Sequence, residues 1–314
     1  MVFRPGRTWP IACPRDEFHE DVVMPGLPRL LHFRVSHYNE KVRWALDYKA
    51  WPHVREALVP GFHVPKVRWL TGQNQLPVLE IDGVVFAGSS RIIAEIERRR
   101  PEPPLYPTEP ESRARAMAIQ AFFDEEVAPD VRRLFWSTYL GRPADCARMA
   151  TDGSSSATRV AWRAVFPVVR PLFRRNMGVG GERLALARKR LPAYLDRLES
   201  EIGASGFLVG DRFGIADLTA AAVMTAIIRP PEFPYPLPEP WPAELVELRE
   251  SIAHRAGFRW VLGVYARHRG RSREVASRAS RWPHRSRPAG ASGRRRPASS
   301  GAAGSPPGTT RNRG

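Results

Sequence analysis

The sequence predicts an α/β domain followed by an all-helical domain, with disordered segments at both ends. Strand-like and helix-like segments alternate between residues 27 and 100. From residue 112 to residue 268, apolar residues recur mainly with the 3.6-residue period of helices. Arg, Ser, Gly, Pro and Ala dominate residues 269–314, a composition typical of disordered chain.

A strand that leads into a helix opens the first domain. Residues 29–35 are apolar enough for a short strand. After them, Val42, Ala45 and Leu46 recur at the spacing of one buried helix face. Ser36 therefore lies where the strand passes into the first turn of the helix. The unpaired N–H groups and the positive helix dipole at that point would stabilise an anion such as a thiolate.

A hairpin and a second helix follow about forty residues later. Residues 78–81 and 84–87 are β-branched runs, and the Asp82-Gly83 pair between them is a strong hairpin signal. The next helix is expected to begin at Ser89. Two further segments complete the domain, a strand over 54–59 and a short helix or loop over 63–70.

The second domain is expected to begin after a proline-rich linker. A long helix is predicted over 114–127, continued or replaced by another after a kink at Pro129. Residues 141–158 are rich in Gly, Ser, Asp and Pro and are expected to form a loop. The apolar run 160–173 is interrupted by two prolines, whereas 182–202 has a clean amphipathic helical pattern.

The last part of this domain contains a helix-capping pattern. Gly214 stands at the N-cap of a predicted helix, and Asp217 at its third position can accept from the cap N–H. Glycine in place of Ser or Thr is expected to weaken the cap by a few tenths of a kcal/mol. Seven prolines make residues 230–242 a rigid loop, and one or two helices follow over 245–266.

Composition limits the classes of function. The net charge is +17, but thirteen arginines and one glutamate lie in residues 267–314, so the charge is mainly that of the tail. No run of 18 apolar residues is present, so no membrane span is expected, and the N-terminus lacks the apolar core of a signal peptide. Cys13 and Cys146 give no disulfide framework and suit a reducing cytoplasm.

The order of these motifs resembles the thioredoxin-like N-terminal domain of glutathione S-transferases. The shared features are a strand, a Ser-x-x-x-x-Lys-x-Arg helix, Gln-Leu-Pro, an Asp-Gly hairpin and a helix opened by serine. Residues 36–39 take the place of the Cys-Pro-Tyr-Cys motif of the related glutaredoxins. Composition and the resemblance together predict a disordered extension 1–26, a thioredoxin-like glutathione-binding domain 27–100, a linker 101–111, an all-helical domain 112–268 and a disordered basic tail 269–314.

The resemblance implies that Ser36 is the catalytic residue. Only a thiolate attacks efficiently, and a free thiol with a pKa of about 8.5 is mostly protonated at neutral pH. The Ser36 hydroxyl would donate a hydrogen bond to the sulfur, and such charge-assisted bonds contribute roughly 1.5–3 kcal/mol. A helix cap without a ligand is the alternative. Tyr38 and Asn39 are close enough to substitute, although Tyr38 is expected to pack and Asn39 to cap the helix.

The glutathione backbone is expected to lie along residues 75–77. Leu76 would offer its N–H and C=O to the peptide, which requires a cis bond into Pro77, and Gln75 would reach the tripeptide backbone or its glycyl end. Ser90 would hold the γ-glutamyl carboxylate at a helix start. Ser89 stands where the family usually has Glu, Asp or Gln, which leaves the γ-glutamyl ammonium a poorer partner. Helix capping is the alternative for both serines.

The electrophile pocket is expected to include Tyr38, Trp136 and Tyr139, although aromatic residues at helical spacing also suit a core. Lys41 and Arg43 would either raise the local potential or form a solvated face. Neither cysteine is near position 36 in the sequence, so thiol-transfer chemistry is not expected.

The resemblance implies a cytoplasmic, homodimeric detoxification enzyme with glutathione as co-substrate, a small electrophile as its second substrate and no metal. A non-catalytic binding or scaffold protein of the same fold is the second hypothesis. The third is association with nucleic acid through the arginine-rich tail, which would depend strongly on salt.

Overall fold

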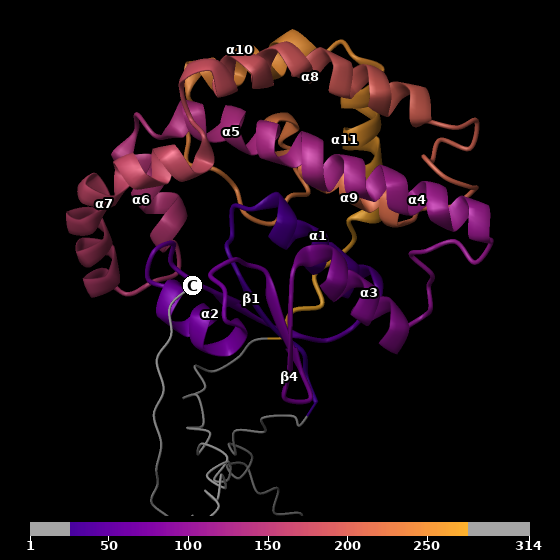
Figure 1. Cartoon of the computed structure of the whole chain (residues 1–314), viewed down its shortest axis with the longest axis horizontal. Helices are drawn as coiled ribbons and strands as arrows, with labels where there is room; N and C mark the ends of the chain where they lie inside the picture. Colours follow the sequence, from indigo (N-terminus) through magenta and orange to yellow (C-terminus); the bar gives the residue numbers. More distant parts are fainter. Residues whose placement is uncertain (1–25, 276–314) are drawn as a thin grey trace, which may run out of the picture. The chain divides into compact units, whose positions relative to one another are not determined.

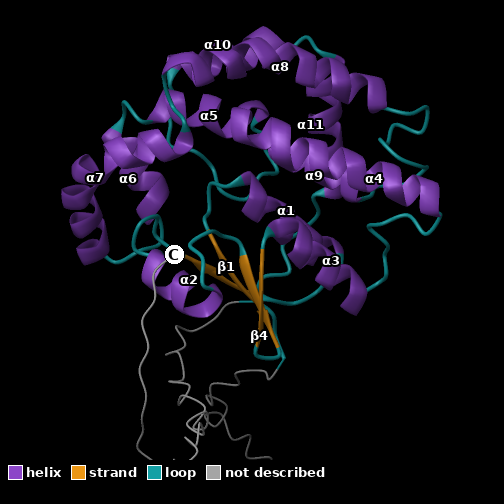
Figure 2. Cartoon of the chain, in the orientation of Figure 1, coloured by secondary structure: helices purple, strands orange, loops and turns teal. Residues whose placement is uncertain are grey.

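The computed structural model describes residues 26–275, which form the two domains expected from the sequence (Figures 1 and 2). The first domain combines strands and helices, and the second is helical, so the predicted fold class is confirmed. The strands are β1 Arg29–His32, β2 Val54–Ala57, β3 Val78–Ile81 and β4 Val84–Ala87. The helices of the first domain are α1 His37–Tyr48, α2 Val64–Thr71 and α3 Ser89–Arg99.

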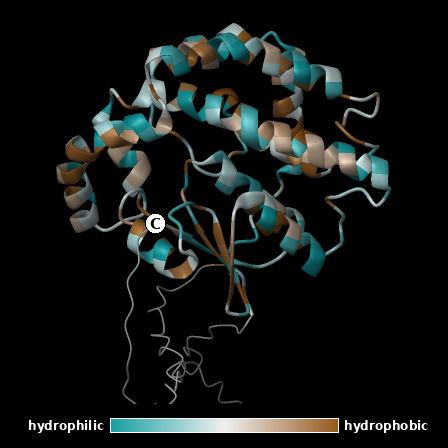
Figure 3. Ribbon diagram, in the orientation of Figure 1, coloured by the Kyte–Doolittle hydropathy of each residue, from teal (hydrophilic) through white to brown (hydrophobic). Residues whose placement is uncertain are grey.

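The sheet of the first domain separates two hydrophobic clusters. Its order is β2-β1-β3-β4, with β1 and β2 parallel and the other neighbours antiparallel. Successive side chains of a strand point to opposite faces, so Leu30 packs with Val42 of α1 and Ile92 of α3, while Leu31 packs with Val67 of α2. The four residues of β4 are all apolar, and this strand is brown in Figure 3. This is the thioredoxin-like arrangement that the resemblance implies.

The second domain is built around one almost wholly buried helix, α9. Packed against α9 are α1 of the first domain and several helices of the second. None of the helices within residues 26–275 combines the length and the apolarity needed to cross a bilayer. The helices of this domain are α4 Pro110–Phe122, the π-helical turn η1 Phe123–Val127, α5 Ala128–Tyr139, α6 Pro143–Thr151, α7 Ser156–Met177, α8 Gly181–Glu201, α9 Ile215–Ile228, α10 Ala243–Ile252 and α11 Ala256–His268.

One sequence expectation for this domain is wrong. The predicted loop over 141–158 contains helix α6, whose first residue is Pro143, a position that needs no backbone N–H. Helix α7 continues through Pro167 and Pro171. Both prolines are exposed, so the carbonyl groups that they leave without a donor can be hydrated.

The predicted start of the tail is also wrong by seven residues. Residues 269–275 lie against the first domain, where Arg269 is buried and the Arg273 N–H donates to Asp47 Oδ1 at 2.7 Å. Val275 N donates to the His53 carbonyl at 2.9 Å. The rest of the predicted tail and almost all of the predicted N-terminal extension lie outside the described residues.

Candidate functional site

The register of the sheet brings the three segments predicted to bind glutathione to one edge. Leu31 of β1 pairs with Val78 of β3, and Val78 pairs in turn with Ala87 of β4. The chain that leaves β1, the chain that enters β3 and the chain that leaves β4 therefore meet at the same end of the sheet. In sequence order, these three segments carry Ser36, residues 75–77, and Ser89 with Ser90.

Ser36 is the N-cap of α1. Its backbone is extended, with φ −153° and ψ 124°, and its Oγ accepts a long hydrogen bond of 3.5 Å from the Asn39 N–H. The residue is half-buried, and within residues 26–275 its hydroxyl donates to no acceptor. A hydroxyl in this state can donate to an anion at the helix start, where the dipole is positive.

The three residues after Ser36 are fixed by packing. Burial lowers the pKa of His37 to about 3, so the ring is neutral. The Tyr38 hydroxyl donates to the Asp124 carbonyl at 2.8 Å, and burial raises its pKa to about 12. Tyr38 therefore packs, as expected. The expectation that Asn39 caps the helix is wrong, because Ser36 is the cap and the Asn39 side chain is fully buried.

The segment before β3 has an unpaired backbone. The Leu76–Pro77 peptide bond is cis, as the resemblance requires. Gln75 is exposed, and its carbonyl already accepts from Gln73 Nε2 at 3.0 Å. The Leu76 N–H and C=O, in contrast, make no hydrogen bond within the described part of the chain. A backbone edge of this kind can add a further extended peptide by strand-type hydrogen bonds.

Ser89 and Ser90 are the first two residues of α3. Ser90 Oγ donates at 2.7 Å to a carboxylate of the helical domain, that of Asp124 in η1. Lys41 Nζ lies 2.6 Å from both oxygens of the same carboxylate, and the Lys41 side chain is fully buried. Burial lowers the pKa of Lys41, although the Asp124 carboxylate opposes this shift. The solvated-face alternative for Lys41 is therefore wrong.

Asp124 is a site residue that sequence reasoning did not single out. It stands 34 positions after Ser90 and belongs to the other domain. No spacing rule connects two such positions, so only the folded structure, in which Asp124 bonds to Lys41 of α1 and Ser90 of α3, reveals the contact.

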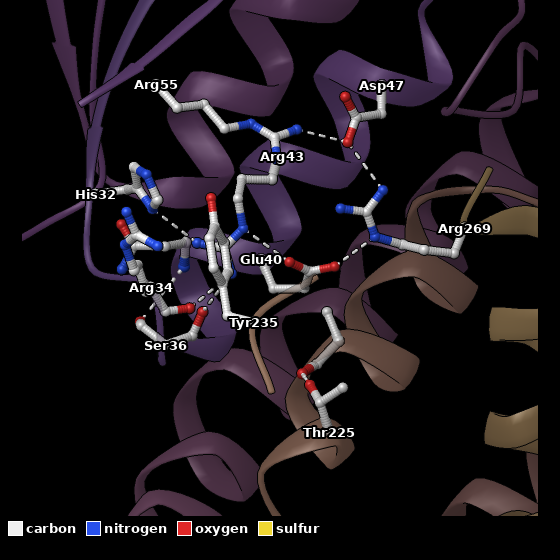
Figure 4. A network of polar contacts seen from close by, with 12 residues as sticks. His32, Arg34, Ser36, Glu40, Arg43, Asp47, Arg55, Thr225, Tyr235 and Arg269 are labelled. Atoms are coloured by element: carbon white, nitrogen blue, oxygen red, sulfur yellow. Dashed lines mark hydrogen bonds and ion pairs between the residues drawn. The ribbon is translucent and has the colours of Figure 1, made fainter. Parts of the chain in front are cut away.

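Arg43 lies in a buried network of charges and not on a solvated face (Figure 4). Its Nε donates to Glu40 Oε2 at 2.8 Å, and the second oxygen of Glu40 accepts from Arg269 at 2.5 Å. Asp47 Oδ2 accepts from Arg55 at 2.6 Å and from Arg269 at 2.8 Å. Three guanidinium groups thus share two buried carboxylates, and a third carboxylate, that of Glu274, lies 3.8 Å from Arg55.

The three residues predicted for the electrophile pocket lie in packed surroundings. Tyr139 is wholly buried, and Trp136 is partly buried against the same hydrophobic cluster, which also contains Met149 and Leu237. These last two residues help to line a cavity of about 360 Å³. Tyr38, Trp136 and Tyr139 are not among its lining residues.

The cysteine of the described region takes no part in this site. Cys146 is buried in α6, and burial raises the pKa of its thiol to about 12. Cys13 lies outside the described residues. Within residues 26–275, no group of three or more His, Cys, Asp or Glu side chains is arranged to hold a metal ion.

Two segments of the chain match family models. Residues 30–104 match the N-terminal domain of glutathione S-transferases, and residues 181–244 match the C-terminal domain. Among curated proteins, none matches the chain.

Several solved structures are similar to the chain. A beta-etherase from Sphingobium sp. strain SYK-6 is 19% identical, with 75% of this chain and 98% of that one covered and a TM-score of 0.51. A glutathione S-transferase from Rhodospirillum rubrum is 22% identical, with 75% and 92% covered and a TM-score of 0.49. One from Methylobacterium radiotolerans, in complex with glutathione sulfonate, is 21% identical, with 81% and 99% covered and a TM-score of 0.46. Because both family domains occur in order on the expected fold, the chain belongs to the glutathione S-transferase family.

Proposed function

We propose that the chain binds glutathione at the sheet edge described above and transfers its thiolate to a small electrophile. The observation that carries the proposal is the convergence of three features at that edge. They are the unpaired backbone of Leu76, the Ser36 hydroxyl without an acceptor, and the amino end of α3. Together they offer a backbone edge that can pair with the peptide, a hydrogen-bond donor to its thiolate and a binding site for its γ-glutamyl carboxylate.

Ser36 would act by stabilising charge and not as a nucleophile. Ionisation of the glutathione thiol releases its proton to solvent, and the Ser36 hydroxyl keeps its own proton while donating to the sulfur. The thiolate then forms the new C–S bond with the electrophile. The neutral ring of His37 and the buried, paired Lys41 leave the hydroxyl and the helix dipole as the local stabilising groups.

Asp124 supports binding of the γ-glutamyl end. The carboxylate of that end would bond to the Ser90 N–H and hydroxyl, and Gln75 would reach the glycyl end. The Ser89 position lacks the usual acid, but Asp124 brings a carboxylate oxygen within 2.7 Å of Ser90 Oγ. An ammonium group bound there would be paired by an acid of the helical domain.

A non-catalytic binding protein of the same fold is the alternative. One observation favours it, because the Ser90 hydroxyl is already engaged by Asp124 and must exchange partners before it can hold a ligand. In either case, assembly as a homodimer and a cytoplasmic location are part of the proposal, by analogy with the family.

Two measurements test the proposal. Purified protein should be retained on immobilised glutathione and eluted by free glutathione, and Ser90→Ala should abolish retention without loss of folding by circular dichroism. Titration with glutathione near pH 7 should then produce the ultraviolet absorbance of a bound thiolate. Retention without a thiolate signal and without turnover would support the binding protein, and the lack of any retention would reject both functions.

A further inference from the structure

A cavity of about 360 Å³ lies beside the segment that leads into Ser36. One wall is Arg34 and Val35, the two residues that precede Ser36. The carbonyl groups of Arg34 and Ser36 both accept from Arg43 Nη2, at 3.2 and 3.5 Å (Figure 4). The Arg43 side chain therefore fixes the backbone of this wall and that of Ser36 relative to each other. The opposite walls come from the helical domain, namely α6, the start of α7 and the proline-rich loop.

The charged lining of the cavity is predominantly basic. It contains Arg34, Arg148 and Arg159 against the single acid Asp152, which pairs with Arg34 Nη1 at 2.8 Å. Within residues 26–275, the other two guanidinium groups bond to no carboxylate. Arg148 donates to the Glu239 carbonyl at 3.4 Å, a distance at which a hydrogen bond is weak.

Arg159 is held in place by its own helix start. Its Nη1 donates to the Ser154 carbonyl and its Nη2 to Ser156 Oγ, each at 2.7 Å. These two acceptors are neutral, so the charge of Arg159 is not cancelled. A guanidinium held in this way can bind a carboxylate, by donating hydrogen bonds to it, with little further loss of side-chain entropy.

A second layer of positive charge lies behind Tyr235, another lining residue. The Arg43 guanidinium carbon is 4.8 Å from the centre of the Tyr235 ring, and Arg229 Nη2 donates to the Tyr235 carbonyl at 3.3 Å. Both arginines are buried. Arg43 is paired with Glu40, whereas Arg229 bonds to no carboxylate within the described residues. Charge in a poorly solvated region acts over longer distances than charge in water, so Arg229 adds to the positive potential of the cavity.

The remaining lining is apolar. Val35, Met149 and Leu237 belong to or pack on one hydrophobic cluster, and two prolines flank Leu237 in the cavity wall. Ligand sites combine an apolar lining with a few polar groups that fix orientation. An occupant that fits this lining has a small apolar body and an anionic group.

We propose that this cavity holds the electrophilic co-substrate and that the preferred co-substrate carries a carboxylate, which Arg148 and Arg159 bind. The proposal rests on the proposed function, since it takes Ser36 to mark the sulfur position. A suitable probe is 4-chloro-3-nitrobenzoate. The glutathione thiolate attacks the carbon that bears chlorine, the C–S bond forms, the C–Cl bond breaks, and chloride leaves with the electron pair.

The kinetic test compares this probe with its neutral amide, 4-chloro-3-nitrobenzamide, in the full chain. After correction for the uncatalysed rates, kcat/KM should favour the acid by on the order of tenfold, the factor that one charge-assisted hydrogen bond supplies. The double variant Arg148→Gln, Arg159→Gln should lower kcat/KM for the acid by that factor more than for the amide, and so abolish the preference. Arg163→Gln is the matched control, because Arg163 is exposed one turn along α7 from Arg159 and does not line the cavity. It should keep the preference.

Equal turnover of acid and amide by the wild-type chain would overturn the proposal. A preference for the acid that survives in the double variant would also overturn it. So would a preference that is lost equally in Arg163→Gln, because the net charge of the protein and not the cavity would then be responsible.

A binding measurement separates this proposal from the proposed function. Unreactive 3-nitrobenzoate should quench tryptophan fluorescence in the absence of glutathione, and 3-nitrobenzamide should bind at least several-fold more weakly. If glutathione fails to bind while 3-nitrobenzoate binds through Arg148 and Arg159, the transferase function is rejected but the anion site stands. If glutathione binds and 3-nitrobenzoate shows no preference over the amide, only the anion site is rejected.

Discussion

At the scale of single residues, Ser36 has two roles that a substitution removes together. Ser36→Ala removes both the helix cap and the proposed donor to sulfur. We expect the pKa of bound glutathione to rise by about one to two units, because a charge-assisted hydrogen bond contributes roughly 1.5–3 kcal/mol. The pH titration of thiolate absorbance in the complex measures this shift.

The cap of α7 provides the control for this variant. Ser155 Oγ accepts from the Thr158 N–H at 3.1 Å, so Ser155→Ala removes a cap of the same kind far from position 36 in the sequence. Both variants should lose about 1 kcal/mol or less of unfolding free energy. An unshifted thiol pKa in Ser36→Ala would leave Ser36 as a cap only.

The buried ring of His53 should make the unfolding free energy of the protein fall in acid. Arg55 Nε donates to His53 Nε2 at 2.9 Å, and Nδ1 lies 2.7 Å from the Trp51 carbonyl, so the neutral ring satisfies both contacts. Burial, aided by Arg55, lowers the pKa of His53 from 6.5 to about 4. Between these values the unfolded chain binds a proton that the folded chain does not, so the unfolding free energy should fall as the pH drops from about 6.5 towards 4.

Urea unfolding measured at several pH values tests this contribution. His53→Gln should flatten the pH dependence in that window, whereas substitution of the exposed His254 by Gln should leave it as in the wild type. If the unfolding free energy changed with pH equally in the wild type and in both variants, His53 would not titrate in the way that its contacts indicate.

At the scale of elements, the start of α9 explains the glycine that replaces the usual cap residue. Asp217 Oδ2 accepts from the Gly214 N–H at 2.9 Å, and Asp217 Oδ1 accepts from the Leu208 N–H at 2.8 Å. A Cβ atom at Gly214 would lie 3.0 Å from the Leu105 carbonyl oxygen. That carbonyl already accepts from the Ile215 N–H at 2.7 Å and cannot easily move. Glycine therefore makes room for the interdomain linker.

We expect Gly214→Ser to destabilise the protein, although serine is the better cap in isolated helices. The added Cβ forces the linker or α9 to shift, and overpacking of this kind typically costs about 1–3 kcal/mol. Gly141→Ser is the control, since a Cβ atom there meets nothing within 4 Å. Thermal unfolding compares the two, and a gain in stability for Gly214→Ser would contradict this account of the cap.

Elements with local signals were predictable, and elements that depend on distant partners were not. The hairpin at Asp82-Gly83 and the strand before Ser36 are specified by residues within a few positions of each other. Helix α6 was missed, because its composition resembles that of a loop and its helical form depends on the cluster around Cys146. The burial of Lys41 was missed for the same reason, since its partner lies 83 positions away.

At the scale of the whole molecule, the chain beyond α11 closes a charge network on the first helix. Arg269 bonds to Glu40 and Asp47, and all three side chains are almost completely buried. Removing one partner of a buried ion pair leaves an uncompensated charge and costs roughly 3–5 kcal/mol. We therefore expect Arg269→Ala to lower the unfolding free energy by about that amount, measured by urea unfolding.

Arg267→Ala is the matched control, because Arg267 is an exposed residue of α11 two positions earlier. A chain ended after Val275 should keep the stability of the full chain, and a chain ended after His268 should lose as much as Arg269→Ala does. Equal stability of these two shortened chains would show that the network does not hold the domains together.

During synthesis on the ribosome, the contacts of Arg269 with α1 can form only after nearly the whole helical domain has been made. About 170 residues separate the end of α3 from this arginine, so at roughly 5–20 residues per second translation continues for about 10 to 30 seconds after the first domain is synthesised. During that interval Glu40 and Asp47 lack one of their cations. Protease pulses on stalled nascent chains should find α1 susceptible until Arg269 has left the exit tunnel, and protected afterwards.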